Sequence, residues 1–322
     1  MNAEVSLEDR IRGGIIGLLV GDALGVPYEF HPKEQIPPFE EIEFQPPANF
    51  DRAHRGVPSG TYSDDGAQAL CLLASLLECG KFNADDFAKK IVAWYREDYM
   101  AVDKVFDVGI QTQKAILNLR KGFPPLTAGP SEDRQNGNGS LMRVLPLALW
   151  HKGTDLELVA DTFDQSAVTH GHIRSKLCCA LYCLWARRIL QSVENAWESA
   201  VETIYEIFPE GTIENAELET HIRPKDKIFE LKGSGYVVDS LRVGVWANNN
   251  KTFEETVKAA ISLGEDTDST ACIAGGIAGL KFGVQAISER WQRNLRGKAN
   301  YEPLLEKLLQ YSNPYHFQLK KT

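Results

Sequence analysis

Residues 264–283 read GEDTDSTACIAGGIAGLKFG, so an acidic cluster is followed directly by an apolar segment built mostly of small residues. Each glycine inside a helix costs about 1 kcal/mol of helix stability relative to alanine, and this cost is tolerated where another element must approach closely. An early apolar segment carries a similar glycine series, namely Gly13, Gly14, Gly17, Gly21 and Gly25. Both segments are therefore predicted to be helices that pack tightly in the core.

Helical periodicity extends over most of the chain. Ser6 is the expected N-cap of the first helix, and Gly80 is the expected C-cap of the second. The predicted helices cover residues 7–24, 67–79, 84–99, 107–119, 141–150, 155–168, 173–191, 196–208, 238–247, 253–263, 268–282, 286–295 and 301–311. Strand signals are few, because no alternating polar and apolar run outside loops exceeds about five residues. The sequence predicts an all-α fold with one domain, residues 1–322, and long loops at 31–62, 122–140 and 209–235.

Composition restricts the class of protein. The chain has 322 residues, 25% of them charged, and a formal net charge of -9. No basic stripe is present, which argues against general nucleic-acid binding. The first apolar run is interrupted by Asp22 and is too short to span a bilayer, so no membrane segment is expected. The start lacks the features of a signal peptide, and the six cysteines lie in helix-like runs, which favours a cytoplasmic protein with reduced thiols.

Two acidic clusters precede predicted helices. The first consists of Ser63, Asp64 and Asp65, and the second lies in the stretch 266–269 and holds two further aspartates and a serine. A simple interpretation is helix capping, since Asp and Ser are good N-caps and the helix dipole favours negative charge there. A cap needs only one oxygen, however, and carboxylates brought close together repel one another unless a cation is present. Carboxylates and hydroxyls without His or Cys suit Mg²⁺ or Mn²⁺.

The second cluster has two other interpretations. An EF-hand loop starting at Asp266 would need Gly at its sixth position and Glu at its twelfth, where the chain has Ala271 and Ile277. The spacing of Asp266, Asp268 and Thr270 also resembles a phosphatase signature that should follow a buried strand. The preceding apolar residues recur at helical spacing instead, which disfavours the phosphatase.

Six motifs together resemble the ADP-ribosylglycohydrolase family, which includes the enzymes that remove ADP-ribose from dinitrogenase reductase. They occur in the family's order and extend over nearly the whole chain, from about residue 10 to 285. The motifs are GLLVGDALGVPYEF (17–30), YSDD (62–65), NGNGSLMRVLPLAL (136–149), THGH (169–172), GSGYVVDSLRVGVWA (233–247) and LGEDTDSTACIAGGIAGL (263–280). The resemblance implies a compact orthogonal helical bundle with two bound Mg²⁺ or Mn²⁺ ions.

The resemblance also assigns roles to residues. The implied metal ligands are Ser63, Asp64, Asp65, Asp266, Asp268 and Ser269. Glu29 stands where some relatives have an acidic residue beside the metals, and it is expected to position the attacking water. Asp107 matches an aspartate that reaches the substrate ribose, although taken alone it could be a helix N-cap. The expected catalytic carboxyl groups are therefore Glu29, Asp65 and Asp107.

Substrate contacts are expected from three further segments. Asn138, Gly139 and Ser140 are expected to cradle the pyrophosphate, because glycines let the backbone approach a ligand and free N–H groups at a helix start bind anions. His170 is expected to face the ligand, although a core histidine is the alternative. The third segment is expected to pack on the adenosine and contains Gly233, Gly235 and Tyr236, whose ring could instead belong to the core.

The resulting hypothesis is a metal-dependent hydrolase that acts on ADP-ribosylated proteins and yields ADP-ribose. Arginine-linked ADP-ribose is the first expectation, and serine-linked or polymeric ADP-ribose is the second. The sequence departs from the family at two positions: Gly66 replaces a usual Thr, and Glu265 replaces a usual Gly. These departures support the alternative of a protein that binds ADP-ribose or ADP-ribosylated partners without turnover.

Overall fold

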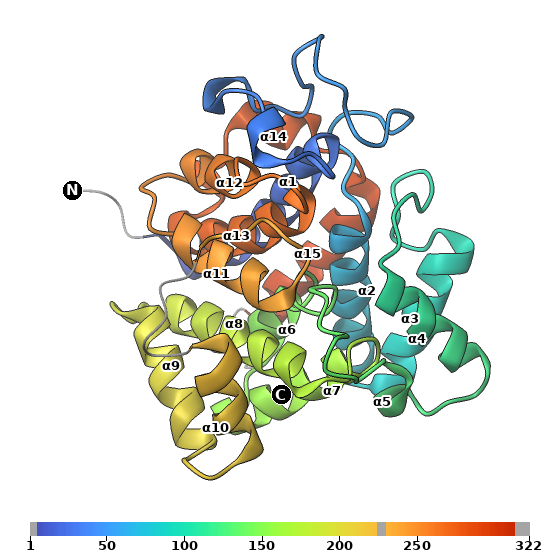
Figure 1. Ribbon diagram of the computed structural model, residues 1–322, viewed down its shortest axis with the longest axis vertical. Helices are drawn as coiled ribbons and strands as arrows, with labels where there is room; N and C mark the ends of the chain where they lie inside the picture. The colour runs from blue at the N-terminus through green and yellow to red at the C-terminus, as the bar shows by residue number, and fades with distance from the viewer. Residues whose placement is uncertain (1–4, 224–229, 313–322) are drawn as a thin grey trace, which may run out of the picture.

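The computed structural model describes residues 5–223 and 230–312, which form a bundle of α-helices (Figure 1). These ranges contain fifteen α-helices and no strand, and their only β-type pairings are two isolated bridges, Pro32 with Gly264 and Gly137 with Tyr236. The predicted all-α fold class is confirmed. The single domain over residues 1–322 stays a prediction, because residues 1–4, 224–229 and 313–322 lie outside the described ranges.

Most predicted helices are present, with changed ends. The α-helices are α1 Leu7–Gly25, α2 Asp64–Cys79, α3 Ala84–Glu97, α4 Ile110–Arg120, α5 Pro125–Ala128, α6 Leu145–Trp150, α7 Asp155–Ala167, α8 Ile173–Leu190, α9 Ala196–Ile207, α10 Ile213–Glu217, α11 Val237–Ala247, α12 Phe253–Ile261, α13 Thr267–Phe282, α14 Glu289–Asn294 and α15 Lys298–Ser312. Ser6 caps α1 through its side chain, and Gly80 ends α2 in the left-handed conformation, as expected.

Several boundaries differ from the sequence prediction. The helix expected from residue 107 begins at Ile110, and the one expected from residue 141 begins at Leu145, where Pro146 favours a first turn. The predicted loop 122–140 contains the short helix α5. The predicted loop 209–235 contains α10 and a π-helical turn, Leu218–Ile222, and its residues 224–229 lie outside the described ranges.

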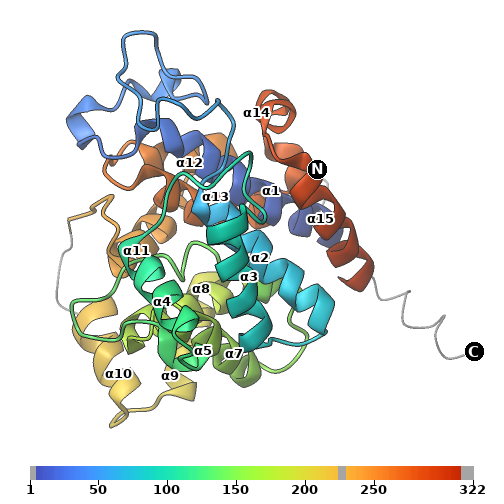
Figure 2. The ribbon, with the colours of Figure 1, turned by 90° about the vertical axis from the view of Figure 1, so that its right-hand side faces the viewer.

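The centre of the bundle is an antiparallel pair, α1 and α13, which lie side by side in both views (Figures 1 and 2). A Cβ atom added to Gly21 would lie 2.1 Å from the carbonyl oxygen of Ala271. The same close approach recurs at three further pairs: Gly13 with Gly279 at 2.2 Å, Gly17 with Gly275 at 2.4 Å and Gly25 with Thr267 at 2.3 Å. Residues four apart share one helix face, so the two small-residue stripes set the pairing.

Burial, rather than length, distinguishes α1 from a membrane span. Together with the 3₁₀ turn Val26–Tyr28, this helix is long and apolar enough by composition to cross a bilayer. The sequence argument that the run is too short is therefore wrong. In the folded chain 94% of the apolar window is buried inside the protein. The helix therefore forms part of the protein core.

The antiparallel pairing also places the acidic residues. The C-terminal end of α1, which leads into Glu29, meets the N-terminal end of α13, which carries Asp266 and Asp268. The N-terminal end of α2, with Asp64, contacts α1 through Asp22. Three helix ends distant in sequence therefore meet at one place.

Candidate active site

The helix ends surround a pocket of about 550 Å³. The loop after α1, the start of α2, the start of α4, the glycine loop before α6 and the segment before α13 all contribute to its walls. Its lining residues are Glu29, Phe30, Asp64, Asp107, Val108, Gly109, Ile110, Gln111, Thr112, Gly137, Asn138, Gly139, Met142, His170, Ser234, Gly235, Glu265, Asp266 and Ser269.

The first acidic cluster forms the N-terminus of α2. Ser63 is the N-cap, and its hydroxyl accepts a hydrogen bond from the N–H of Asp65 and donates one to the Asp65 carboxylate at 3.1 Å. The Asp64 carboxylate accepts a hydrogen bond from the Gln68 amide at 2.9 Å. One carboxylate oxygen of Asp65, Oδ1, is buried without a hydrogen-bond partner in the described structure. Capping therefore accounts for only part of this cluster.

The second cluster surrounds the N-terminus of α13. Asp266 occupies the N-cap position, but its side chain makes no capping bond; it accepts a hydrogen bond from the Asn138 amide at 2.8 Å. The Asp268 carboxylate accepts the N–H of Ser269 at 2.9 Å. Ser269 also lines the pocket. Burial raises the pKa of Asp65, and the nearby charges of Asp22 and Asp266 raise it further, so the two clusters lie close together.

Asp22 is a carboxylate that the sequence interpretation did not place in the site. It is fully buried in α1, and its two oxygens accept the backbone N–H groups of Ser63 at 2.8 Å and Gly66 at 2.7 Å. It therefore fixes the start of α2 against α1. An isolated acid in an apolar helix was the available signal, although it was used only to argue against a membrane span.

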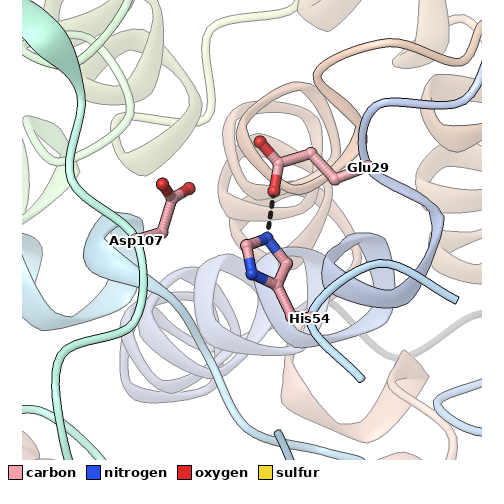
Figure 3. Close-up of side chains that lie close together, drawn as sticks. All are labelled: Glu29, His54 and Asp107. Carbon is pink, nitrogen blue, oxygen red and sulfur yellow. Dashed lines mark hydrogen bonds and ion pairs between the residues drawn. The ribbon is translucent and has the colours of Figure 1, made fainter. Parts of the chain in front are cut away.

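Glu29 belongs to two groups of potential ligands, and Figure 3 shows the one with His54 and Asp107. Carboxylate atoms of Glu29, Asp266 and Asp268 lie within 4.8 Å of one another, and so do ligand atoms of Glu29, His54 and Asp107. His54 Nε2 lies 2.6 Å from a Glu29 carboxylate oxygen. Asp107 lines the pocket and precedes α4, whose N-cap is Gly109, so the alternative that Asp107 caps this helix is wrong. His54 had no motif that could reveal it.

The buried carboxyl groups resist ionisation. Burial raises the pKa of Asp22 to about 7, although the N–H groups of Ser63 and Gly66 oppose this shift. Burial, reinforced by neighbouring acids, raises the pKa of Glu29 to about 10. The pKa values of Asp64, Asp65 and Asp268 are raised well above the usual range for the same reasons. Carboxyl groups held this way ionise together only when positive charge enters the site.

The donor set fits hard divalent cations. The oxygens come from carboxylates and hydroxyls, which suit Mg²⁺ or Mn²⁺. The unpartnered oxygen of Asp65 is a further sign, because a buried polar atom without a partner is costly unless a ligand meets it. The two acidic clusters can therefore hold metal.

The glycine loop before α6 reaches the pocket and also holds neighbouring segments together. Asn138 holds Asp266 and Ser240 with its amide, and its own N–H donates to the carbonyl of Gly235. Gly139 lines the pocket. Ser140 is fully buried, and its hydroxyl accepts a hydrogen bond from Ser166; its part in a pyrophosphate cradle stays a prediction.

His170 lies beneath this glycine loop and lines the pocket. A Cβ atom on Gly139 would come within 2.7 Å of the His170 ring, so the glycine permits this packing. The ring is 2% exposed, and its Nδ1 contacts the Thr169 hydroxyl at 2.8 Å. Burial lowers the pKa of His170 to about 3, which keeps it neutral. Arg143 is also buried and binds Gln68 and Gln165, which agrees with a structural role.

The segment before α11 reaches the pocket through Ser234 and Gly235. Gly233 instead packs on the backbone of Gly264, and its carbonyl accepts the N–H of Asp266. Tyr236 is half-buried, and its ring lies 6.0 Å from the Arg174 guanidinium, outside the residues that line the pocket. Of the three predicted adenosine contacts, only Gly235 lines this pocket.

Comparison with known proteins identifies the family of this chain. The sequence profile of the ADP-ribosylglycohydrolase family matches residues 3–316. ADP-ribosylarginine hydrolase Tri1 of Pseudomonas putida is 30% identical over 93% of this chain and 78% of its own length. ADP-ribosyl-[dinitrogen reductase] glycohydrolase of Rhodospirillum rubrum is 25% identical over 92% and 94%, respectively. A solved ADP-ribosylglycohydrolase-related protein complex superposes with a TM-score of 0.77, at 28% identity, over 95% of this chain and 99% of that chain.

The fold and the site therefore define a helical hydrolase of glycosidic bonds. The chain belongs to the ADP-ribosylglycohydrolase family. The resemblance seen in the sequence motifs is confirmed.

Proposed function

We propose that the protein releases ADP-ribose from ADP-ribosylated arginine side chains of other proteins, in a reaction that depends on two Mg²⁺ or Mn²⁺ ions. The observation that carries this proposal is the meeting of both acidic clusters and Glu29 in one pocket. The ions would be held by Ser63, Asp64, Asp65, Asp266, Asp268 and Ser269. When bound, they supply positive charge that polarises the ribose hydroxyls and lowers the pKa of a water in the site.

The protein's own groups complete the chemistry. Glu29 takes a proton from the attacking water as the water oxygen bonds to the anomeric carbon. The carbon–nitrogen bond to arginine breaks through an oxocarbenium-like state, and the electron pair leaves with the guanidine nitrogen. The proton held by Glu29 then passes to that nitrogen. Asp107 would accept a hydrogen bond from the ribose; it lines the same pocket and lies close to His54.

The charge of the pocket favours an arginine linkage over a neutral serine linkage. The lining carries the acids Glu29, Asp64, Asp107, Glu265 and Asp266, and none of its residues is Lys or Arg. Bound cations would neutralise the buried acids, whereas Glu265 is exposed and its carboxylate has no partner in the described ranges. A guanidinium is a cation that can pair with this carboxylate.

The pyrophosphate needs donors other than basic side chains. The N-cap of α4 is Gly109, which has no side chain to cap the helix. The first turn of this helix, from Ile110 to Thr112, lines the pocket. The free N–H groups and the dipole of such a helix start favour a phosphate. We assign the pyrophosphate to this turn and to Gly139. His170 supports Gly139 from below.

The test compares three substrates: an arginine-ADP-ribosylated protein, a serine-ADP-ribosylated peptide and a phosphomonoester. The proposal expects free ADP-ribose from the first with Mg²⁺ or Mn²⁺, no release with EDTA, and loss of release in Asp64→Asn and Asp266→Asn. Faster release from the serine-linked peptide would overturn the proposed linkage. Tight binding of ADP-ribose without release from either substrate would identify a binding protein, and activity on the phosphomonoester alone would overturn the reaction class.

A further inference from the structure

The long loop between α1 and α2 returns to Glu29 after more than twenty residues. Its return point is anchored by the N–H of Ala53, which donates to the carbonyl of Pro27 at 2.9 Å. The next residue, His54, has a positive φ of 48°, a conformation that non-glycine residues rarely adopt. The imidazole faces the carboxyl group of Glu29 (Figure 3).

Aromatic rings hold the imidazole in place. The Phe30 ring lies 5.6 Å from the His54 ring, and the Phe106 ring lies 5.0 Å from it in an edge-on arrangement. The side chain of His54 is only 13% exposed. Phe30 follows Glu29 and Phe106 precedes Asp107. The His54 ring therefore packs between the two segments that carry these expected catalytic carboxyl groups.

The imidazole meets Glu29 directly. His54 Nε2 lies 2.6 Å from Glu29 Oε2, and in the described ranges this is the one hydrogen bond to the Glu29 carboxyl group. On the other side, Glu29 approaches Asp266 and Asp268. Three acids close together repel one another, so nothing on that side holds Glu29 in a fixed position before cations enter. His54 therefore supplies the contact that orients it.

We propose that His54 is a positioning residue, which holds the carboxylate of Glu29 over the acidic clusters through the Nε2–H donor. The expected loss of activity rests on the proposed function, whereas the orientation of Glu29 by His54 does not. Residues that orient the side chains of a metal site by hydrogen bonds have measurable effects, because their substitution lowers metal affinity or activity by about 10- to 100-fold.

The kinetic test compares three single variants. His54→Ala removes the donor, whereas His54→Gln retains an N–H group at about the reach of Nε2. Arg55→Ala is the matched control, because Arg55 is the next residue of the same loop. Its side chain is exposed, and in the described ranges its one salt bridge is with Asp51. We expect kcat on arginine-linked substrate to fall about 10- to 100-fold in His54→Ala with KM within about threefold of the unmodified protein. His54→Gln should recover most of this loss, and Arg55→Ala should change neither constant.

A double-mutant cycle separates positioning from general damage to the fold. In a Glu29→Gln background, His54→Ala should cost less than about threefold, because the carboxylate that it orients is gone. An equal loss in both backgrounds would overturn the proposal. So would a failure of His54→Gln to recover activity while its urea unfolding midpoint matches that of the unmodified protein.

A readout independent of turnover completes the test. The affinity for Mn²⁺, measured by calorimetry, should fall about tenfold in His54→Ala and remain unchanged in Arg55→Ala. If the unmodified protein releases no ADP-ribose from arginine, the proposed function fails, while this measurement still decides the role of His54. An unchanged Mn²⁺ affinity in His54→Ala would overturn the inference even if the enzyme is active.

Discussion

The carboxylate of Asp22 accepts a hydrogen bond from the backbone N–H of Gly66 at 2.7 Å. The neighbouring oxygen of the same carboxylate accepts the N–H of Ser63 at 2.8 Å. Gly66 stands where the family motif usually has Thr, so no side chain at residue 66 can help to hold the start of α2. This start is tied to α1 through Asp22, so Asp64 and Asp65 are held without help from a side chain at residue 66.

Asp22→Ala should therefore destabilise the protein. The change leaves two buried backbone N–H groups without acceptors, each costing about 1–3 kcal/mol, so we expect the free energy of unfolding to fall by about 2–6 kcal/mol. Urea denaturation measures this change. Asp51→Ala is the control, because Asp51 is exposed and pairs only on the surface; it should change stability by less than about 0.5 kcal/mol. Equal effects of the two substitutions would contradict the role of Asp22.

Gly21→Ala tests the close contact between α1 and α13. Alanine gains about 1 kcal/mol in helix propensity, but its Cβ would lie 2.1 Å from the carbonyl oxygen of Ala271. The backbones must separate, so a net loss of about 1–3 kcal/mol is expected. Gly56→Ala is the matched control, since a Cβ there meets nothing within 4 Å. A stabilised Gly21→Ala protein would show that the two helices are not packed this closely.

The stability of the metal-free protein should fall as pH rises. The pKa of Asp22 is about 7 in the folded state against 3.8 as its ordinary value, and that of Glu29 is about 10 against 4.5. Between these values the folded state binds more protons than the unfolded state, so unfolding becomes easier with increasing pH. In EDTA, the melting temperature should therefore decrease from pH 5 to pH 8.

Added Mn²⁺ should reverse this trend, because cations compete with protons for the same oxygens. We expect the increase in melting temperature on adding Mn²⁺ to be larger at pH 8 than at pH 5. Thermal unfolding at the two pH values, with EDTA and with Mn²⁺, checks both statements. A metal-free protein that becomes more stable towards pH 8 would contradict the buried, repelling carboxyl groups.

Glu265 should control recognition of the arginine acceptor. It adopts a positive φ of 62°, and its backbone is held there by hydrogen bonds with Phe30 and His31. Glu265→Gln removes the charge and keeps the backbone, so KM for arginine-linked substrate should rise about three- to tenfold with little change in kcat. Inhibition by free arginine should weaken by a similar factor, while the neutral analogue citrulline serves as the control. Unchanged inhibition by arginine would contradict this assignment.

Much of the fold could be predicted because it depends on local patterns. The small residues of α1 and α13 indicated close packing, and the structure confirms it at Gly17 and Gly21. Both acidic clusters were visible because each lies within a few residues at a helix start. The end of the 141–150 helix was predicted correctly and its beginning was not, because residues 141–144 form a turn that completes the glycine loop.

The remaining features depend on contacts between distant residues. His54 lies in an irregular loop, and its approach to Glu29 follows from how that loop folds back. Ser140 belongs to the glycine motif, but its hydroxyl contacts Ser166, which lies 26 residues further along the chain. Asp22 could be noticed as a buried acid, but its partners on α2 lie more than forty residues away.

The central claim is that the clusters at the starts of α2 and α13 are halves of one site for two cations. Titration with Mn²⁺ followed by electron paramagnetic resonance tests it most directly. The account predicts two bound ions per chain with a spin-coupled signal, which is lost in both Asp64→Asn and Asp266→Asn. Two independent, uncoupled ions, or a coupled pair that survives either substitution, would contradict it.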